Sequence, residues 1–106
     1  MTGKIGAEVE MADGIKAAEQ TGLAILATLK SAVGSLNKIK RVVKVLGIVN
    51  CRQDFTEHPQ VINGCSEMFA KIWGAENGVG VRSAVGMNSL PLHITVEIEA
   101  MFEIGE

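Results

Sequence analysis

The segment HITVEIEAMFEI, residues 93–104, alternates apolar and mostly polar side chains from end to end. Successive side chains of a β-strand point to opposite faces, so this alternation predicts a strand with one face in the core. The core-facing set is Ile94, Val96, Ile98, Ala100, Phe102 and Ile104, and the outward set is Thr95, Glu97, Glu99, Met101 and Glu103. The fold must therefore contain a sheet that is covered on one side.

Two segments with helical periodicity can supply that cover. In residues 12–33 apolar side chains recur at spacings of three, four and seven, and Gly34 is suited to end the helix. A second helix is predicted to begin just after Thr56 or Glu57 and to end at Gly74, with Pro59 in its first turn. Two helices can cover only one face of such a sheet, which leaves the other face uncovered.

The remaining segments add further strands. Residues 36–51 are rich in β-branched side chains and predict a long strand, and residues 78–91 predict another. A short first strand is predicted at residues 4–9. The element order is β-α-β-α-β-β, and we expect an α+β fold with both helices packed on one face of the sheet. With no linker or repeat, the chain is predicted to form a single domain, 1–106.

Composition restricts the functional classes. Hydrophobic residues make up 47% of the chain and the net charge is −2, so neither nucleic acid nor an anionic membrane is an expected partner. The apolar run TGLAILATL is too short to span a bilayer, and the first residues lack a signal-peptide layout, so we expect a cytoplasmic protein. An uncovered sheet face in a chain this apolar is expected to pack against copies of itself.

The cysteines and histidines do not form a metal-binding pattern. Cys51 and Cys65 are not arranged as C-x-x-C, and His58 and His93 each lack a partner at ligand spacing. We therefore expect no metal site, two reduced core thiols, and isolated histidines with structural or surface roles.

The stretch GVGVRSAVGMNSLP carries one charged side chain, Arg82. Strand alternation places Gly80, Ala84 and Gly86 on the same face of the strand as Arg82, so the neighbours of the guanidinium on that face are small. Two interpretations are open at this point. Arg82 either pairs with a carboxylate across the strands, or it clamps a ligand carboxylate while Glu97, on the neighbouring strand, acts on water. We expect Arg82 and Glu97 near the uncovered face.

The chain resembles a known family at these residues. VRSAVGMNSLP followed by VEIEAMFEI is similar to the signature of the RidA/YjgF family, and VINGCSEMFAKIWG resembles its second helix. The resemblance extends from about Gly3 to Ile104. It implies a chorismate mutase-like α+β fold, assembled as a homotrimer with clefts between subunits. It also implies hydrolytic deamination of reactive 2-imino and enamine acids to 2-oxo acids and ammonia, without a metal or organic cofactor.

The resemblance assigns roles to four residues. Arg82 matches the arginine that holds the substrate carboxylate, and Glu97 matches the catalytic glutamate near the attacking water. Asn63 matches an asparagine near the cleft. Ala84 stands where many members have cysteine, so it can act only through its backbone. The substrate-binding residues expected from the resemblance are thus Arg82, Ala84 and Asn63.

One departure from the family concerns the N-terminus. Family members begin with a β-hairpin and often carry a tyrosine that walls the pocket, whereas this chain starts where the hairpin should have ended and contains no tyrosine. We therefore expect an N-terminally short domain. Two functions are compatible with it. One is an imine deaminase at an intersubunit cleft, and the other is a non-catalytic trimer that binds a small carboxylate or has a purely structural role.

Overall fold

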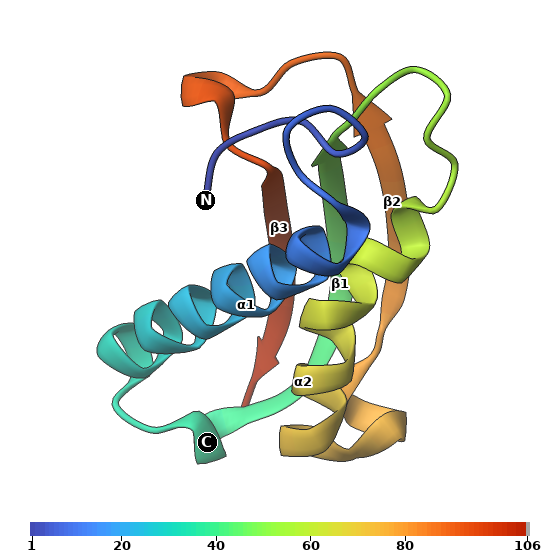
Figure 1. The fold of residues 1–106 in the computed structure, drawn as a ribbon. Helices are drawn as coiled ribbons and strands as arrows, with labels where there is room; N and C mark the ends of the chain where they lie inside the picture. The colour runs from blue at the N-terminus through green and yellow to red at the C-terminus, as the bar shows by residue number, and fades with distance from the viewer. Residues whose placement is uncertain (106) are drawn as a thin grey trace.

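The computed structural model describes residues 1–105, and the last residue of the predicted domain, Glu106, lies outside them. The elements in chain order are α1 (Met11–Val33), β1 (Ile39–Asn50), α2 (His58–Gly78), β2 (Val81–Met87) and β3 (Val96–Ile104), as Figure 1 shows. A short 3₁₀ helix precedes β1 and another precedes β3. The predicted α+β class is confirmed, and the sheet is mixed.

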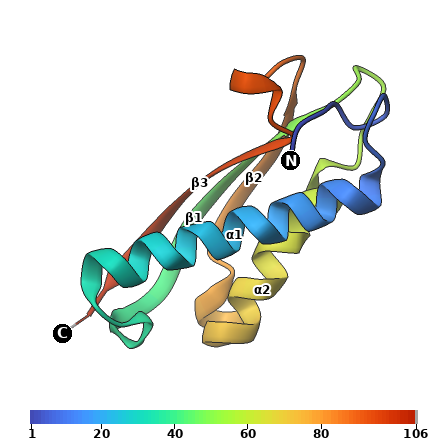
Figure 2. The ribbon, with the colours of Figure 1, turned by 60° about the vertical axis from the view of Figure 1, so that its left-hand side comes forward.

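The sheet has the strand order β2-β1-β3, so β1 lies between the other two strands. β1 pairs in parallel with β2 and antiparallel with β3. Both helices pack on one face of this sheet, which Figure 2 shows from the side. The expectation that the strands of Arg82 and Glu97 are neighbours is wrong. The helical crossover α2 brings β2 beside β1 in parallel, and β3 pairs with the other edge of β1.

β1 changes its alternation along its length. The register between β1 and β3 shifts between Ile39 and Arg41, and again between Val42 and Lys44. Each shift gives β1 one extra residue, as in a β-bulge, and an extra residue turns the side chains that follow to the other face. The buried positions on the helix side are Ile39, Val42, Val45, Gly47 and Val49. The buried residues are thus three positions apart across the bulges and two positions apart beyond them, which keeps one face of the long strand in the core.

The core lies between the sheet and the two helices. Its largest fully buried side chain is Phe69 of α2, whose ring meets the rings of Trp73 and Phe102 at centroid distances of 5.7 Å. α1 approaches α2 very closely at Gly64, where an added Cβ would lie 2.2 Å from the carbonyl oxygen of Ile15. A residue without a side chain is required at that contact, so a glycine allows the helices to form one layer.

The predicted first strand, residues 4–9, is not a strand in the structure. Ile5 forms isolated β-bridges with Val9 and Cys51, but the bridges do not extend into a ladder. Gly6 has a φ of 93°, a left-handed conformation that glycine adopts readily. The chain therefore turns back on itself at the point where a strand would continue.

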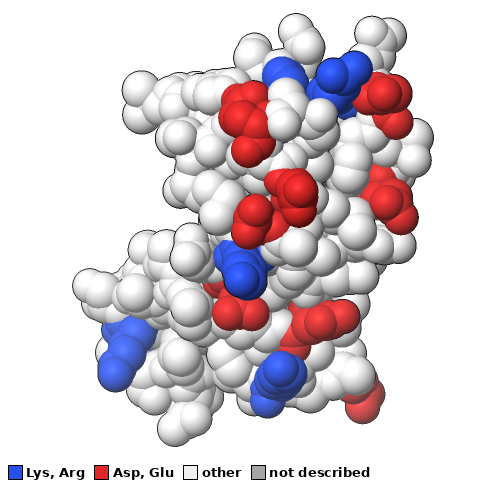
Figure 3. Space-filling model, viewed as in Figure 1, with Lys and Arg blue, Asp and Glu red and all other residues white. Residues whose placement is uncertain are grey.

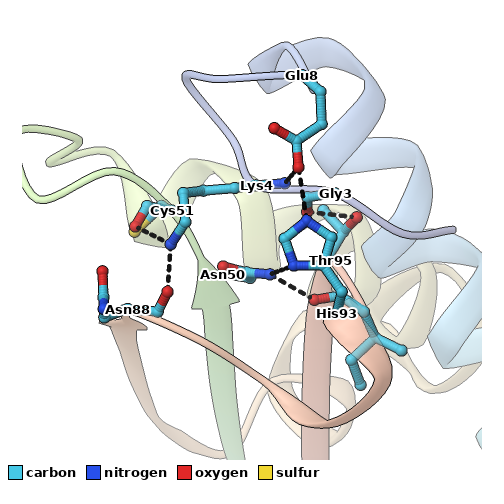
Figure 4. Close-up of polar contacts among 9 residues, drawn as sticks. Gly3, Lys4, Glu8, Asn50, Cys51, Asn88, His93 and Thr95 are labelled. Atoms are coloured by element: carbon cyan, nitrogen blue, oxygen red, sulfur yellow. Dashed lines mark hydrogen bonds and ion pairs between the residues drawn. The ribbon is translucent and has the colours of Figure 1, made fainter.

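Polar contacts hold this N-terminal loop on the ends of the strands (Figure 4). Lys4 Nζ donates hydrogen bonds to the carbonyl oxygens of Cys51 and Asn88, which follow β1 and β2. Glu8 Oε1 lies 2.6 Å from Nε2 of His93, in the segment that leads into β3. The hydrogen bond with His93 lowers the pKa of the Glu8 carboxyl below its usual range. The loop thus connects segments that flank all three strands.

The two faces of the sheet differ in exposure. The face away from the helices carries exposed Val81, Val85, Met87 and Met101, and no helix of residues 1–105 packs on it. On the helix side, Figure 3 shows acidic and basic side chains interspersed over the surface. Neither helix in the described part of the chain combines the length and the apolar character needed to cross a bilayer.

Candidate functional site

Arg82 lies on β2 with its side chain toward the helices. Its register partner on β1, Val45, is fully buried. Ala84 stands beside Gly47, against which Ile62 of α2 packs. Arg82 and Ala84 are accordingly half-buried on the covered face of the sheet. The expectation that Arg82 lies near the uncovered face is wrong, because the alternation of β2 turns its valines outward and its arginine toward α2.

α2 supplies two neutral partners for the guanidinium of Arg82. Nη1 donates a hydrogen bond to Asn63 Oδ1 over 2.6 Å and another to Ser66 Oγ over 3.2 Å. Among residues 1–105, no carboxylate lies within ion-pair distance of Arg82. The ion pair across the strands, which one of the two interpretations of Arg82 requires, is therefore not observed in the described chain.

Ser66 is the member of this site that the sequence pattern did not single out. It is 6% exposed, and its hydroxyl accepts from Arg82. Asn63 and Ser66 are three residues apart, so both face the same side of the helix. That spacing of polar side chains beside a buried stripe is the signal that could have identified Ser66.

A small cavity opens beside Arg82. Its volume is about 260 Å³, and its lining comprises Asn63, Ser66, Glu67, Ala70, Val79 and Arg82. A guanidinium has five N–H donors, and only Nη1 is engaged by α2, so donors remain for a ligand. The apolar side chains of Ala70 and Val79 suit a short carbon chain. The site can therefore accept a small carboxylate.

The neighbouring Cys65 reports on the environment beneath Arg82. It is fully buried, and this burial raises the pKa of its thiol to about 12, although the positive charge of Arg82 opposes the rise. Cys51 is also buried, and neither thiol forms a disulfide. The expectation that both thiols lie in the core is confirmed.

Glu97 lies apart from Arg82. Its register partner is Ile48, which points away from the helices, and β1 separates the strands of the two residues. Glu97 lines a different cavity of about 400 Å³, together with Gln20 and Thr21 of α1. One chain thus brings Asn63 to Arg82, but it does not bring Glu97 to them.

The two histidines have partners that come from distant parts of the chain. His58 Nε2 lies 3.5 Å from Cys51 Sγ, and His93 contacts Glu8. The sequence does not reveal these two contacts, because they depend on how the loops fold over the strand ends. Within residues 1–105, no group of three or more His, Cys, Asp or Glu side chains gathers in a way that could hold a metal ion.

Comparison with known proteins extends this picture. A family model described as "YjgF/chorismate_mutase-like, putative endoribonuclease" matches residues 1–102. Protein TCP17 of Trypanosoma cruzi is 38% identical over 105 residues, which cover 99% of this chain and 66% of that protein. The chain thus spans slightly less than two thirds of the length of this curated relative.

Two solved structures are similar over nearly the whole chain. Protein Atu1372 of Agrobacterium tumefaciens, whose function is given as unknown, has a TM-score of 0.93 and 44% identity, covering 98% of this chain and 67% of its own. A protein of Shewanella oneidensis MR-1, described as a "putative endoribonuclease", has a TM-score of 0.90 and 28% identity, covering 97% and 68%. The two helices and the three-stranded sheet therefore recur within longer proteins.

Proposed function

Because the chain belongs to the YjgF/chorismate mutase-like family, we propose that it binds a small carboxylate at Arg82 and, assembled with its own copies, hydrolyses 2-imino acids to 2-oxo acids and ammonia. The observation that carries this proposal is the guanidinium of Arg82, which two neutral side chains hold beside a cavity of about 260 Å³. A half-buried guanidinium without an acidic partner in the described chain is suited to a ligand anion.

The proposed reaction depends mainly on orientation. The carboxylate of a 2-imino acid accepts hydrogen bonds from Arg82, which fixes the position of the adjacent C=N carbon. Water adds to that carbon while a base takes its proton, and the nitrogen receives a proton in return. The new hydroxyl group then loses its proton and the nitrogen gains a second one, so the C–N bond breaks, ammonia leaves, and the C=O group of the 2-oxo acid remains. Glu97 is the base in this proposal.

Glu97 must come from another copy in this scheme, because in one chain it lies beyond β1 and on the opposite face. The uncovered face offers an apolar surface for such a copy, with Val81 66% exposed and Met101 61% exposed. Exposed apolar surface of this kind favours association. We therefore place the reaction at a cleft between copies and expect a homotrimer.

A second candidate function is a carboxylate-binding or purely structural trimer without catalysis. The observation that favours it is the separation of Glu97 from Arg82 within the chain. In that case Arg82 holds a 2-oxo acid, and Glu97 takes no part in chemistry.

Two measurements distinguish these functions. Calorimetric titration with 2-oxobutanoate measures binding, and ammonia release from a freshly generated 2-imino acid measures turnover. We expect Arg82→Ala to abolish binding while the oligomer stays intact. Arg82→Lys is expected to weaken binding by about tenfold or more, since an ammonium group cannot reproduce the planar fork. Glu97→Gln is expected to keep binding and lose turnover.

The outcomes distinguish catalysis, binding without catalysis and a structural role of Arg82. Binding without any acceleration of hydrolysis by the wild-type protein supports the second function. Failure of the wild-type protein to bind 2-oxobutanoate, together with dissociation of the Arg82→Ala oligomer, identifies Arg82 as a structural residue. Incubation of the same preparations with single-stranded RNA tests the ribonuclease activity that the family description names.

A further inference from the structure

Another cavity lies at the opposite end of β2 from Arg82. β1 and β2 are parallel and end side by side at Asn50 and Met87. A cavity of about 480 Å³ opens beyond these ends, and its lining includes Cys51, Arg52, Phe55, His58, Gly86 and Asn88. Crevices outside the carboxyl ends of parallel strands are recurrent ligand sites. Gly86 lies four positions after Arg82, or about 13 Å along the strand, so the two sites are distinct.

Cys51 and His58 form a thiol–imidazole pair in the wall of this cavity. Cys51 Sγ lies 3.5 Å from His58 Nε2. Cys51 directly follows β1 and His58 begins α2, so the connecting loop closes on itself to bring them together. The ring of Phe55 meets the imidazole edge-on at a centroid distance of 5.5 Å and restricts its orientation. A nucleophile and its base have this arrangement, often with looser contacts when no ligand is bound.

Gly86 allows the pair to lie against β2. A Cβ added at this position would be 2.5 Å from His58 Nε2 and 2.8 Å from Cys51 Sγ. Contacts that short require one of the two groups to move, so a larger residue at position 86 would separate or displace the pair. The missing side chain is therefore a structural condition for the Cys51–His58 contact.

The rim of the cavity carries more positive than negative charge. Lys4 Nζ donates to the carbonyl oxygens of Cys51 and Asn88 (Figure 4). Both of these residues line the cavity, so the ammonium group lies beside it. Arg52 also lines the cavity, and its Nε lies 3.4 Å from Asp54 Oδ1 in an exposed pair. Two cations and one carboxylate leave a net positive charge, which attracts small anions.

We propose that the Cys51–His58 pair is a covalent binding site for small carboxylates that carry an electrophilic carbon, such as α,β-unsaturated acids. With an unsaturated acid, Sγ forms a bond to the β-carbon and the π electrons of the C=C bond move to the α-carbon. The α-carbon takes the proton that His58 has removed from the thiol. Thiol and acid combine into one adduct without an oxidant, while the carboxylate lies toward Lys4 and Arg52.

The state of the free thiol agrees with this assignment of His58. Burial raises the pKa of the Cys51 thiol, although the positive charge of Lys4 opposes the rise. The free thiol is therefore protonated near neutral pH, and a base must take its proton at the moment of attack. Reagents that do not enter the cavity are expected to react slowly.

Alkylation with iodoacetate and iodoacetamide tests the site on the native protein, because the two reagents differ mainly in charge. Peptide mass spectrometry follows Cys51, with the fully buried Cys65 as an internal control. We expect Cys51 to react at least about tenfold faster than Cys65. We also expect the ratio of the iodoacetate rate to the iodoacetamide rate to exceed that of N-acetylcysteine by roughly five- to tenfold. Maleate is expected to add to Cys51 as the whole acid.

Three variants complete the test. His58→Gln is expected to slow alkylation of Cys51 about tenfold or more, and Gly86→Ala, which keeps both reacting groups, is expected to slow it as well. Arg82→Lys is the matched control and is expected to leave the Cys51 rates unchanged, so a failure at this site is distinguishable from a failure of the carboxylate site at Arg82. The proposal is overturned if Cys51 reacts as slowly as Cys65, or if the ratio of the iodoacetate rate to the iodoacetamide rate equals that of N-acetylcysteine. It is also overturned if Cys51 reacts at the wild-type rate in both His58→Gln and Gly86→Ala.

Discussion

The two faces of the sheet come from the same three strands but have opposite roles. The face under the helices buries Val45 and Val49 completely, and Arg82 on this face has hydrogen-bond partners on α2. The other face leaves Val81 and Met101 more than half exposed, and no helix of the described chain covers them. The covered face holds the core, and we propose that the uncovered face serves association.

The largest expected effect tests whether the covered face holds the fold. Phe69→Ala removes a ring that is fully buried between Trp73 and Phe102. We expect a loss of about 3–5 kcal/mol in the free energy of unfolding, measured by urea denaturation. The matched variant Met101→Ala, on the uncovered face, is expected to cost less than about 1 kcal/mol in the dissociated chain. Equal losses would remove the distinction between the two faces.

The next effect concerns the uncovered face. Val85→Asp places a carboxylate within a surface that we expect to be buried between copies, and burying an unpaired charge is costly. Light scattering should show a fall in mass from about three chains to one, while circular dichroism stays unchanged. Leu92→Asp is the control, because Leu92 is 91% exposed and lies outside the sheet. If the wild-type chain itself is a stable monomer at micromolar concentration, the assembly proposal fails.

A smaller effect tests how deeply Cys65 is buried beneath the covered face. The folded pKa of this thiol is about 12 and its ordinary value is 9.0, so the folded protein holds the thiol proton more tightly than the unfolded chain. Stability is therefore fully present below pH 9 and falls as the pH rises toward 12. We expect a loss of about 1 kcal/mol at pH 10. The loss is measured as the difference in pH dependence between the wild type and Cys65→Ala, and parallel curves would contradict it.

The smallest effect concerns the N-terminal loop, which lies over the strand ends rather than on either face. The hydrogen bond with His93 lowers the pKa of Glu8 below 4.5, so its contribution is present above pH 4.5 and disappears as the pH falls through the folded pKa. We expect local opening of residues 4–9 in acid, seen by amide hydrogen exchange, while the sheet stays closed. Glu8→Gln should abolish this pH dependence, and an unchanged profile in that variant would argue against the contact.

The helices could be predicted from the sequence because their signals are local. Residues 12–33 carry helical periodicity, and α1 spans Met11–Val33. Gly74 interrupts the helical backbone with a φ of 84°, as expected for a stop, although α2 resumes and continues to Gly78. Periodicity and end residues report on a chain segment in isolation, which is why they succeed here.

The strand order and the face of Arg82 could not be predicted, because they depend on contacts between elements. The alternation of β2 separates two sets of side chains without saying which set is covered. The valines of β2 look like a core, yet they are exposed. Asn63 and Ser66 on α2 provide polar partners for Arg82, which is why the face that carries the arginine is the covered one. The relation of Arg82 to Glu97 depends in turn on β1 lying between β2 and β3.

The two bulges in β1 also bear on how this strand can change in evolution. Each bulge holds one residue more than the facing stretch of β3, near Lys40 and near Val43. A deletion of one codon at either point removes a residue that has no partner across the strand. The same deletion between Val45 and Val49 would invert the faces of the residues beyond it and turn buried valines outward. We expect length variation among relatives to be tolerated in β1 only at the bulges.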